Sequence, residues 1–125
     1  MRFTLLTVFA ALFSLLAVGT LPAQDLGPGF HKVKDGIYVF APDQTTTTCS
    51  MVVTQEGVVM IDSCNNPLQS RNMLAAVKKV TDKPIRFLID TEVHNDHTWN
   101  HYVFSPPAVV INHQGAAEEI GRAHV

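Results

Sequence analysis

The stretch IRFLIDTEVHNDH, residues 85–97, decides how this chain folds and what chemistry it can carry. Its first five residues, Ile85–Ile89, are largely apolar and predict a buried strand. Polar residues take over directly after this strand, at the end where open α/β sheets place their ligand sites. Four side chains able to donate to a metal fall within this polar segment: Glu92, His94, Asp96 and His97.

These four side chains offer nitrogen and oxygen atoms, which suit zinc or another first-row divalent ion. In an extended chain, residues two apart point the same way, so we expect Glu92, His94 and Asp96 to converge and a turn to bring in His97. A metal held by three protein groups keeps a position open for water and lowers the pKa of that water to about 7. The cluster therefore predicts a site for one or two metal ions that activate water. The alternative is a polar loop whose Asp and His side chains cap a helix.

The residues around this strand predict an α/β layer. Met51–Val53 and Val58–Ile61 form the two arms of a hairpin, and both are continuously apolar, as in strands that are covered on both faces. Asn66-Pro67 is a good helix start, because Asn caps free backbone N–H groups and Pro suits the first helical position. The predicted order is then a helix, the strand of residues 85–89, a polar loop, a strand over 108–111 and a helix over 116–122. This alternation favours the α/β (α+β) class.

Two further strands are predicted nearer the N-terminus. Phe30–Lys34 and Ile37–Phe40 are separated by Asp35-Gly36, a strong two-residue turn signal. The four threonines of residues 45–48 suit strands and exposed loops alike. We interpret them as plain structure, with a hydroxyl-lined pocket as the alternative.

Composition excludes several classes of protein. The chain has 125 residues, of which 46% are hydrophobic and 16% charged, and its formal net charge is −2. This length leaves room for one domain. A chain so near neutrality has no electrostatic reason to bind nucleic acid, and its apolar content argues against a disordered tail. A small-molecule substrate remains the expected partner, and the oligomeric state stays open.

The N-terminus resembles a secretory signal peptide. Met1-Arg2 is a short positive start, Phe3–Val18 is apolar except for two threonines and a serine, and small residues follow. We therefore predict a signal peptide over residues 1–23 and a domain over residues 24–125. The alternative is an uncleaved membrane anchor, against which Pro22 argues. The expected location is periplasmic or secreted, with no membrane association after cleavage. In such an oxidising compartment Cys49 and Cys64 form either a disulfide or two buried free thiols.

The motif of residues 92–97 resembles the metallo-β-lactamase superfamily signature, His-x-His-x-Asp-His. Its surroundings match as well: Gly57–Asp62 resembles the strand of that family that ends in an aspartate, and Asp82–Thr91 resembles the lead-in to the signature. The resemblance covers about Phe30 to Val125. It implies an αββα sandwich, of which this chain holds the first half only.

The resemblance also implies a function. The family consists of hydrolases, and we expect a metal-activated hydroxide that cleaves an ester, amide or lactam bond, with zinc or another divalent ion as cofactor. His94 would bind the first metal, and Asp96 and His97 the second. Asp96 would also orient the nucleophile, which makes it the catalytic candidate. Asp62 would hold a ligand or loop in place from behind.

Two features depart from the pattern of the family. Glu92 stands where the first histidine ligand is expected, and its added negative charge favours a harder metal. The remaining ligands of the family come from the second half of a longer domain, and neither His113 nor His124 matches a ligand position. His101 is expected to be exposed. We therefore retain a second hypothesis, a truncated or decayed family member that binds metal weakly or is purely structural.

Overall fold

The computed structural model describes residues 25–42 and 47–122. The predicted signal peptide, the first two threonines of the run and His124 lie outside these residues. Within the described ranges, no helix has both the length and the apolar character needed to cross a membrane.

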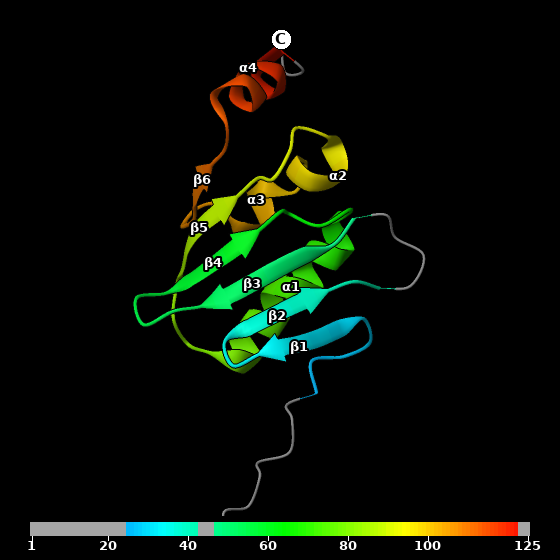
Figure 1. Ribbon diagram of the computed structural model, residues 1–125, viewed down its shortest axis with the longest axis vertical. Coiled ribbons are helices and arrows are strands. Elements are labelled where there is room, and N and C mark those ends of the chain that lie inside the picture. The colour runs from blue at the N-terminus through cyan, green and yellow to red at the C-terminus, as the bar shows by residue number, and fades with distance from the viewer. Residues whose placement is uncertain (1–24, 43–46, 123–125) are drawn as a thin grey trace, which may run out of the picture.

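Six strands form one sheet in chain order (Figure 1). They are β1 (Phe30–Lys34), β2 (Ile37–Phe40), β3 (Cys49–Val53), β4 (Val58–Ile61), β5 (Ile85–Ile89) and β6 (Val109–Ile111). The first four strands pair antiparallel, whereas β5 is parallel to β4 and β6 is parallel to β5. The start of β3 therefore lies at the same edge of the sheet as the ends of β4 and β5, and residues that flank these points can meet.

Four helices accompany the sheet: α1 (Pro67–Val80), α2 (Asn95–Thr98), α3 (His101–Phe104) and α4 (Gln114–Arg122). In Figure 1, α1 lies behind the sheet and links β4 to β5, while α2 and α4 lie beyond the end of the sheet. The prediction of an uninterrupted polar loop after β5 was wrong, because α2 and α3 occupy it. Each has only four residues, which is too short for the 3.6-residue period to show in the sequence.

The core lies between one face of the sheet and the helices. Met51, Met60 and Leu88 on the strands are fully buried, as are Met73 on α1 and Phe104 on α3. Burial of such side chains is the main force that holds the sheet to its helices.

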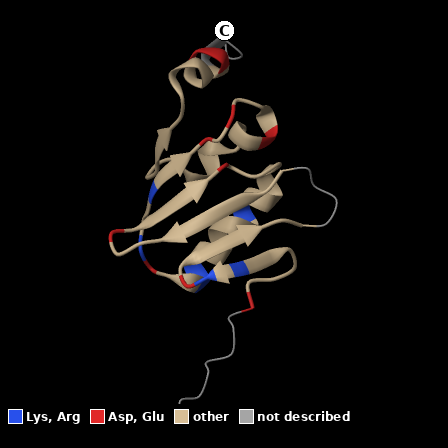
Figure 2. Ribbon diagram, in the orientation of Figure 1, with Lys and Arg blue, Asp and Glu red and all other residues tan. Residues whose placement is uncertain are grey.

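The opposite face of the sheet is open among the described residues. Phe87 pairs with Val109 and Ile89 with Ile111, and all four side chains are exposed. Strands β2, β3 and β4 carry no Lys, Arg, Asp or Glu and are tan in Figure 2. The expectation of cover on both faces is therefore met on one face only. One sheet with helices on one side is half of a four-layer sandwich, which agrees with the predicted fold class.

Two local predictions are confirmed. Asp35-Gly36 joins β1 to β2, and Gly36 has a φ of +78°, which glycine adopts without a steric cost. The side chain of Asn66 accepts a hydrogen bond of 3.0 Å from the backbone N–H of Gln69, and Pro67 is the first helical residue.

The Asn66 cap leads to a first test. We expect Asn66→Ala to lower the free energy of unfolding by about 1 kcal/mol, because it leaves an N–H group at the helix start without its acceptor. For a domain of this size the melting temperature should fall by roughly 4–8 °C. The exposed neighbour Asn65 provides the control, since Asn65→Ala removes no cap. Equal melting temperatures for the two variants would contradict the capping role.

Candidate metal site

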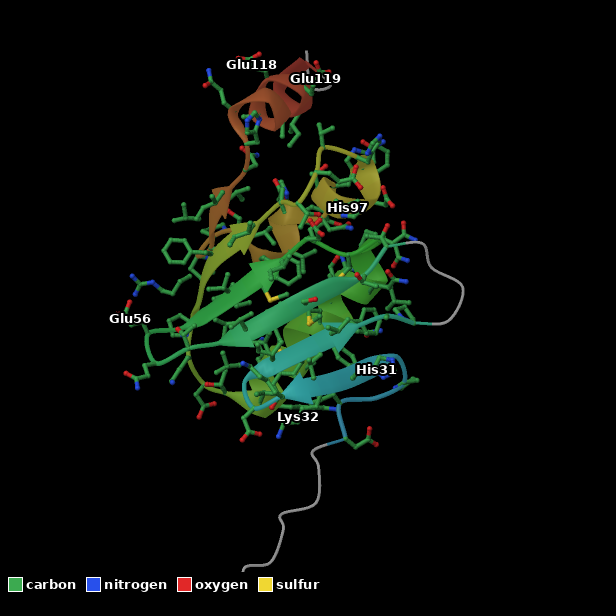
Figure 3. All side chains as sticks on the ribbon, in the orientation of Figure 1. His31, Lys32, Glu56, His97, Glu118 and Glu119 are labelled. Atoms are coloured by element: carbon green, nitrogen blue, oxygen red, sulfur yellow. A yellow bond between two sulfur atoms is a disulfide. The ribbon has the colours of Figure 1, made fainter. Side chains whose placement is uncertain are left out.

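The four predicted metal donors lie beyond the ends of β4 and β5. Glu92 and His94 follow β5 in extended chain, and His94 is the residue directly before α2. Asp96 and His97 are on α2 itself. His97 lies between α2 and the end of the sheet (Figure 3). The short helix, rather than a continued extended chain, brings Asp96 and His97 to this edge.

The Glu92 carboxylate joins the two histidines. One of its oxygens contacts Nδ1 of His94, and the other lies 2.9 Å from Nε2 of His97. Asp96 Oδ2 is 3.8 Å from the same Nε2 atom. The side chain of His94 is 74% exposed and that of His97 16%, so the cluster is open to solvent on the His94 side. The hydrogen bond that His94 donates to the Glu92 carboxylate, and secondly the negative charge of Glu92, raise the pKa of His94 above its ordinary value.

These donors suit zinc by chemistry, but Glu92 occupies the space between them. Across the described residues, no group of three or more His, Cys, Asp and Glu side chains is arranged to hold a metal ion. A Glu92 oxygen lies against one nitrogen of each histidine, Nδ1 of His94 and Nε2 of His97.

Asp62 supports His97 from the buried side. It follows β4 directly, and its carboxylate accepts hydrogen bonds from the backbone N–H of Thr91 at 2.8 Å and from the Thr91 hydroxyl at 2.7 Å. Asp62 Oδ2 also lies 3.0 Å from Nδ1 of His97. The atoms are not aligned for a hydrogen bond, and this buried Nδ1 has no hydrogen-bond partner in the described part of the chain. With Nδ1 facing Asp62, Nε2 faces Glu92 and Asp96.

The backbone of His97 is held by the loop that follows Asp62. The N–H and the hydroxyl of Ser63 both donate to the carbonyl oxygen of His97, each at 2.7 Å. Asn100 then donates from its backbone to the Ser63 hydroxyl at 3.1 Å and from its side chain to the Cys64 carbonyl at 2.7 Å. A disulfide joins Cys64 to Cys49 at the start of β3, which answers the question that the sequence left open. The loop is therefore tied to both α2 and the sheet.

Two contacts at the site were not predicted. The hydroxyl of Thr47 donates to Oδ2 of Asp96, and this bond is the main reason that the pKa of Asp96 lies below its ordinary value. His101, which was expected to be exposed, is partly buried, and its Nε2 lies 2.8 Å from Oδ1 of the buried Asp90. In the sequence, Asp90 could be singled out as a candidate site residue because it directly follows the buried strand β5.

Comparisons with known proteins agree with this architecture. No protein-family model matches the chain. A linear primary-alkylsulfatase from a Pseudomonas species is 38% identical over 47 residues, which are 38% of this chain and 9% of that protein. Among solved structures, a metallo-β-lactamase from Hirschia baltica superposes with a TM-score of 0.65 at 18% identity, over 79% of this chain and 49% of that one. The chain has the metallo-β-lactamase fold.

A second solved relative superposes over a similar share of this chain. It is described as the first B3 metallo-β-lactamase with an active-site glutamic acid, and it is 26% identical with a TM-score of 0.61, over 74% of this chain and 36% of that one. This chain spans about half the length, or less, of the proteins that it matches. β-Lactamases and alkylsulfatases are both hydrolases, which places the chain among hydrolase relatives.

Proposed function

We propose that this protein is an exported, metal-dependent hydrolase that binds its metal through Glu92, His94, Asp96 and His97. The observation that carries the proposal is the meeting of these four donors at one edge of the sheet, with Asp62 behind His97. The disulfide supports the location, because such bonds persist in oxidising compartments.

Each residue has a defined task in this proposal. A bound divalent ion would supply a water molecule whose pKa is lowered to about 7. Asp62 orients the His97 ring so that Nε2 is available as a ligand. Asp96, kept ionised by the Thr47 hydroxyl, accepts a hydrogen bond from the attacking water and directs it towards the substrate. Glu92 takes the place of a histidine ligand, as the solved relative with an active-site glutamic acid makes reasonable.

Zinc titration followed by calorimetry tests the site. We expect one or two Zn²⁺ ions per chain, and His94→Ala should weaken the affinity at least about 100-fold, because the loss of groups behind the ligands already costs 10–100-fold. His31 is an exposed histidine on β1, so His31→Ala is the matched control and should leave the affinity unchanged. Failure of the protein to bind zinc, or equal loss in the two variants, would overturn the proposed site.

The contacts of Glu92 favour a second candidate role, in which this chain is a structural family member without catalysis. In that case Glu92 would serve only to pair with the two histidines and fix the segment after β5. Glu92→Gln separates the two functions. If Glu92 is a ligand, the loss of its charge should lower zinc affinity about 10-fold, whereas affinity should rise if Glu92 only blocks the nitrogens.

The relatives and the bond types already proposed support two compounds as first test substrates. The 47-residue similarity to an alkylsulfatase makes a linear primary alkyl sulfate, an ester, the first compound to test. A chromogenic β-lactam is the second, since the structural relatives include β-lactamases. Zinc-dependent turnover of either compound, abolished in His94→Ala, would support an enzyme.

A further inference from the structure

Thr47 is brought to the candidate metal site by the topology of the sheet. It lies two residues before β3, and β3 runs antiparallel to β4, with Ser50 opposite Ile61. Thr47 and Thr48 therefore lie beside the loop after β4, which holds Asp62, and close to the segment after β5. This places Thr47 next to Asp96, although 49 residues separate them in sequence.

The environments of Thr47 and Asp96 differ. Thr47 is 3% exposed, and Cys49, two residues later, is joined to Cys64 by the disulfide, so the hydroxyl belongs to a buried residue close to a covalent link. Asp96 is on a helix of four residues and its side chain is 34% exposed. A partly exposed carboxylate on such a short helix has several rotamers available, and a hydrogen bond from a fixed donor selects one of them. In that rotamer Oδ2 points towards Nε2 of His97.

We infer that Thr47 is a positioning residue, which fixes the Asp96 carboxylate so that Asp96 and His97 can bind one metal ion together. The inference rests on the proposed function and adds a residue that lies outside the metal motif. Thr47 does not itself contact the metal or the substrate. Its effect is exerted through the orientation of one Asp96 oxygen.

A Co²⁺ titration monitored by the visible absorption of the bound ion tests this role. Thr47→Val keeps the shape of the side chain but removes the donor, and it should weaken binding of the ion at Asp96 and His97 by about 10–100-fold. Thr47→Ser keeps the hydroxyl and should remain within a few-fold of the wild type. Thr48 is the exposed neighbour, and Thr48→Val is the matched control with no expected change.

The double variant shows whether Thr47 acts through Asp96. In an Asp96→Ala background, Thr47→Val should cause little further loss, because the carboxylate that accepts the hydrogen bond from the hydroxyl is gone. Urea unfolding of each variant shows whether a loss of Co²⁺ affinity is due to a loss of folding stability. Thr47→Ser removes only a methyl group and serves as the variant that should remain folded.

The outcomes separate the inference from the proposed function. If the wild type binds Co²⁺ and Thr47→Val binds it as tightly as Thr48→Val does, the inference is wrong while the metal site stands. The inference also fails if Thr47→Ser loses as much affinity as Thr47→Val, or if Thr47→Val causes the same loss in the Asp96→Ala background. A wild-type chain that binds neither Co²⁺ nor Zn²⁺ would overturn the metal site and the inference together.

Discussion

Replacing Asp62 with alanine is expected to lower the free energy of unfolding by about 3–5 kcal/mol. The carboxylate is buried and accepts two hydrogen bonds from Thr91, and bonds to a charged acceptor contribute about 1.5–3 kcal/mol each. Asp62 also has a φ of +59°, a conformation that disfavours alanine by roughly 1 kcal/mol. Since a domain is stable by only about 5–15 kcal/mol, this loss is a large share of the total.

Asp62→Asn divides the Asp62 effect into its parts. Asparagine tolerates positive φ and keeps one acceptor oxygen, so we expect about half of the loss seen with alanine. Asp82 is exposed in the turn after α1, and Asp82→Ala should change stability by less than about 0.5 kcal/mol. Urea denaturation with a common slope measures all three. If Asp62→Ala were as stable as Asp82→Ala, the carboxylate would not be the anchor of the β5 end.

The elements that the sequence predicted well have local causes. Asn66-Pro67 caps and starts α1 through atoms within three residues, and Asp35-Gly36 turns β1 into β2 because glycine accepts positive φ. The four candidate ligands could be named together for a similar reason. They are close in sequence after one buried strand, so any fold that forms β5 brings them to the same edge of the sheet.

Thr47 could not be chosen from the sequence, because its role depends on strand register. Among the described threonines of the run, Thr47 is buried against the site while Thr48 is exposed, and adjacent residues in extended chain point to opposite sides. A shift of one residue in the pairing of β3 with β4 would bury Thr48 and expose Thr47. Register is set by long-range packing, so a run of identical residues gives no information on which one faces Asp96.

The open face of the sheet also could not be predicted from the sequence, because its cover depends on long-range packing. The continuous apolar runs that predicted cover on both faces are present, and Phe87 and Ile89 lie on the uncovered face of β5. Hydrophobic pattern reports that a face favours burial, and it does not report which element covers it. In the part of the chain that the structure describes, α1 and α3 pack on one face alone.

Loss of the disulfide should have an effect comparable to that of Asp62→Ala. The bond between Cys49 and Cys64 closes a loop with a sequence separation of 15, and restricting the unfolded chain over such a loop stabilises the fold by about 3 kcal/mol. The double variant Cys49→Ala/Cys64→Ala, or the wild type in reductant, should melt roughly 12–24 °C lower. Reductant should leave the double variant unchanged, which separates the effect of the bond from that of the reagent.

The same disulfide should also influence the metal site, because it joins the two segments that hold it. Cys49 is two residues from Thr47, and Cys64 is two residues from Asp62, whose loop holds the backbone of His97. Without the bond, the Thr47 donor and the Asp62 support are no longer fixed relative to each other. At a temperature where the double variant remains folded, its zinc affinity should fall about 10-fold, in the range found for groups behind a ligand. Unchanged affinity in a folded double variant would mean that hydrogen bonds alone preserve the site.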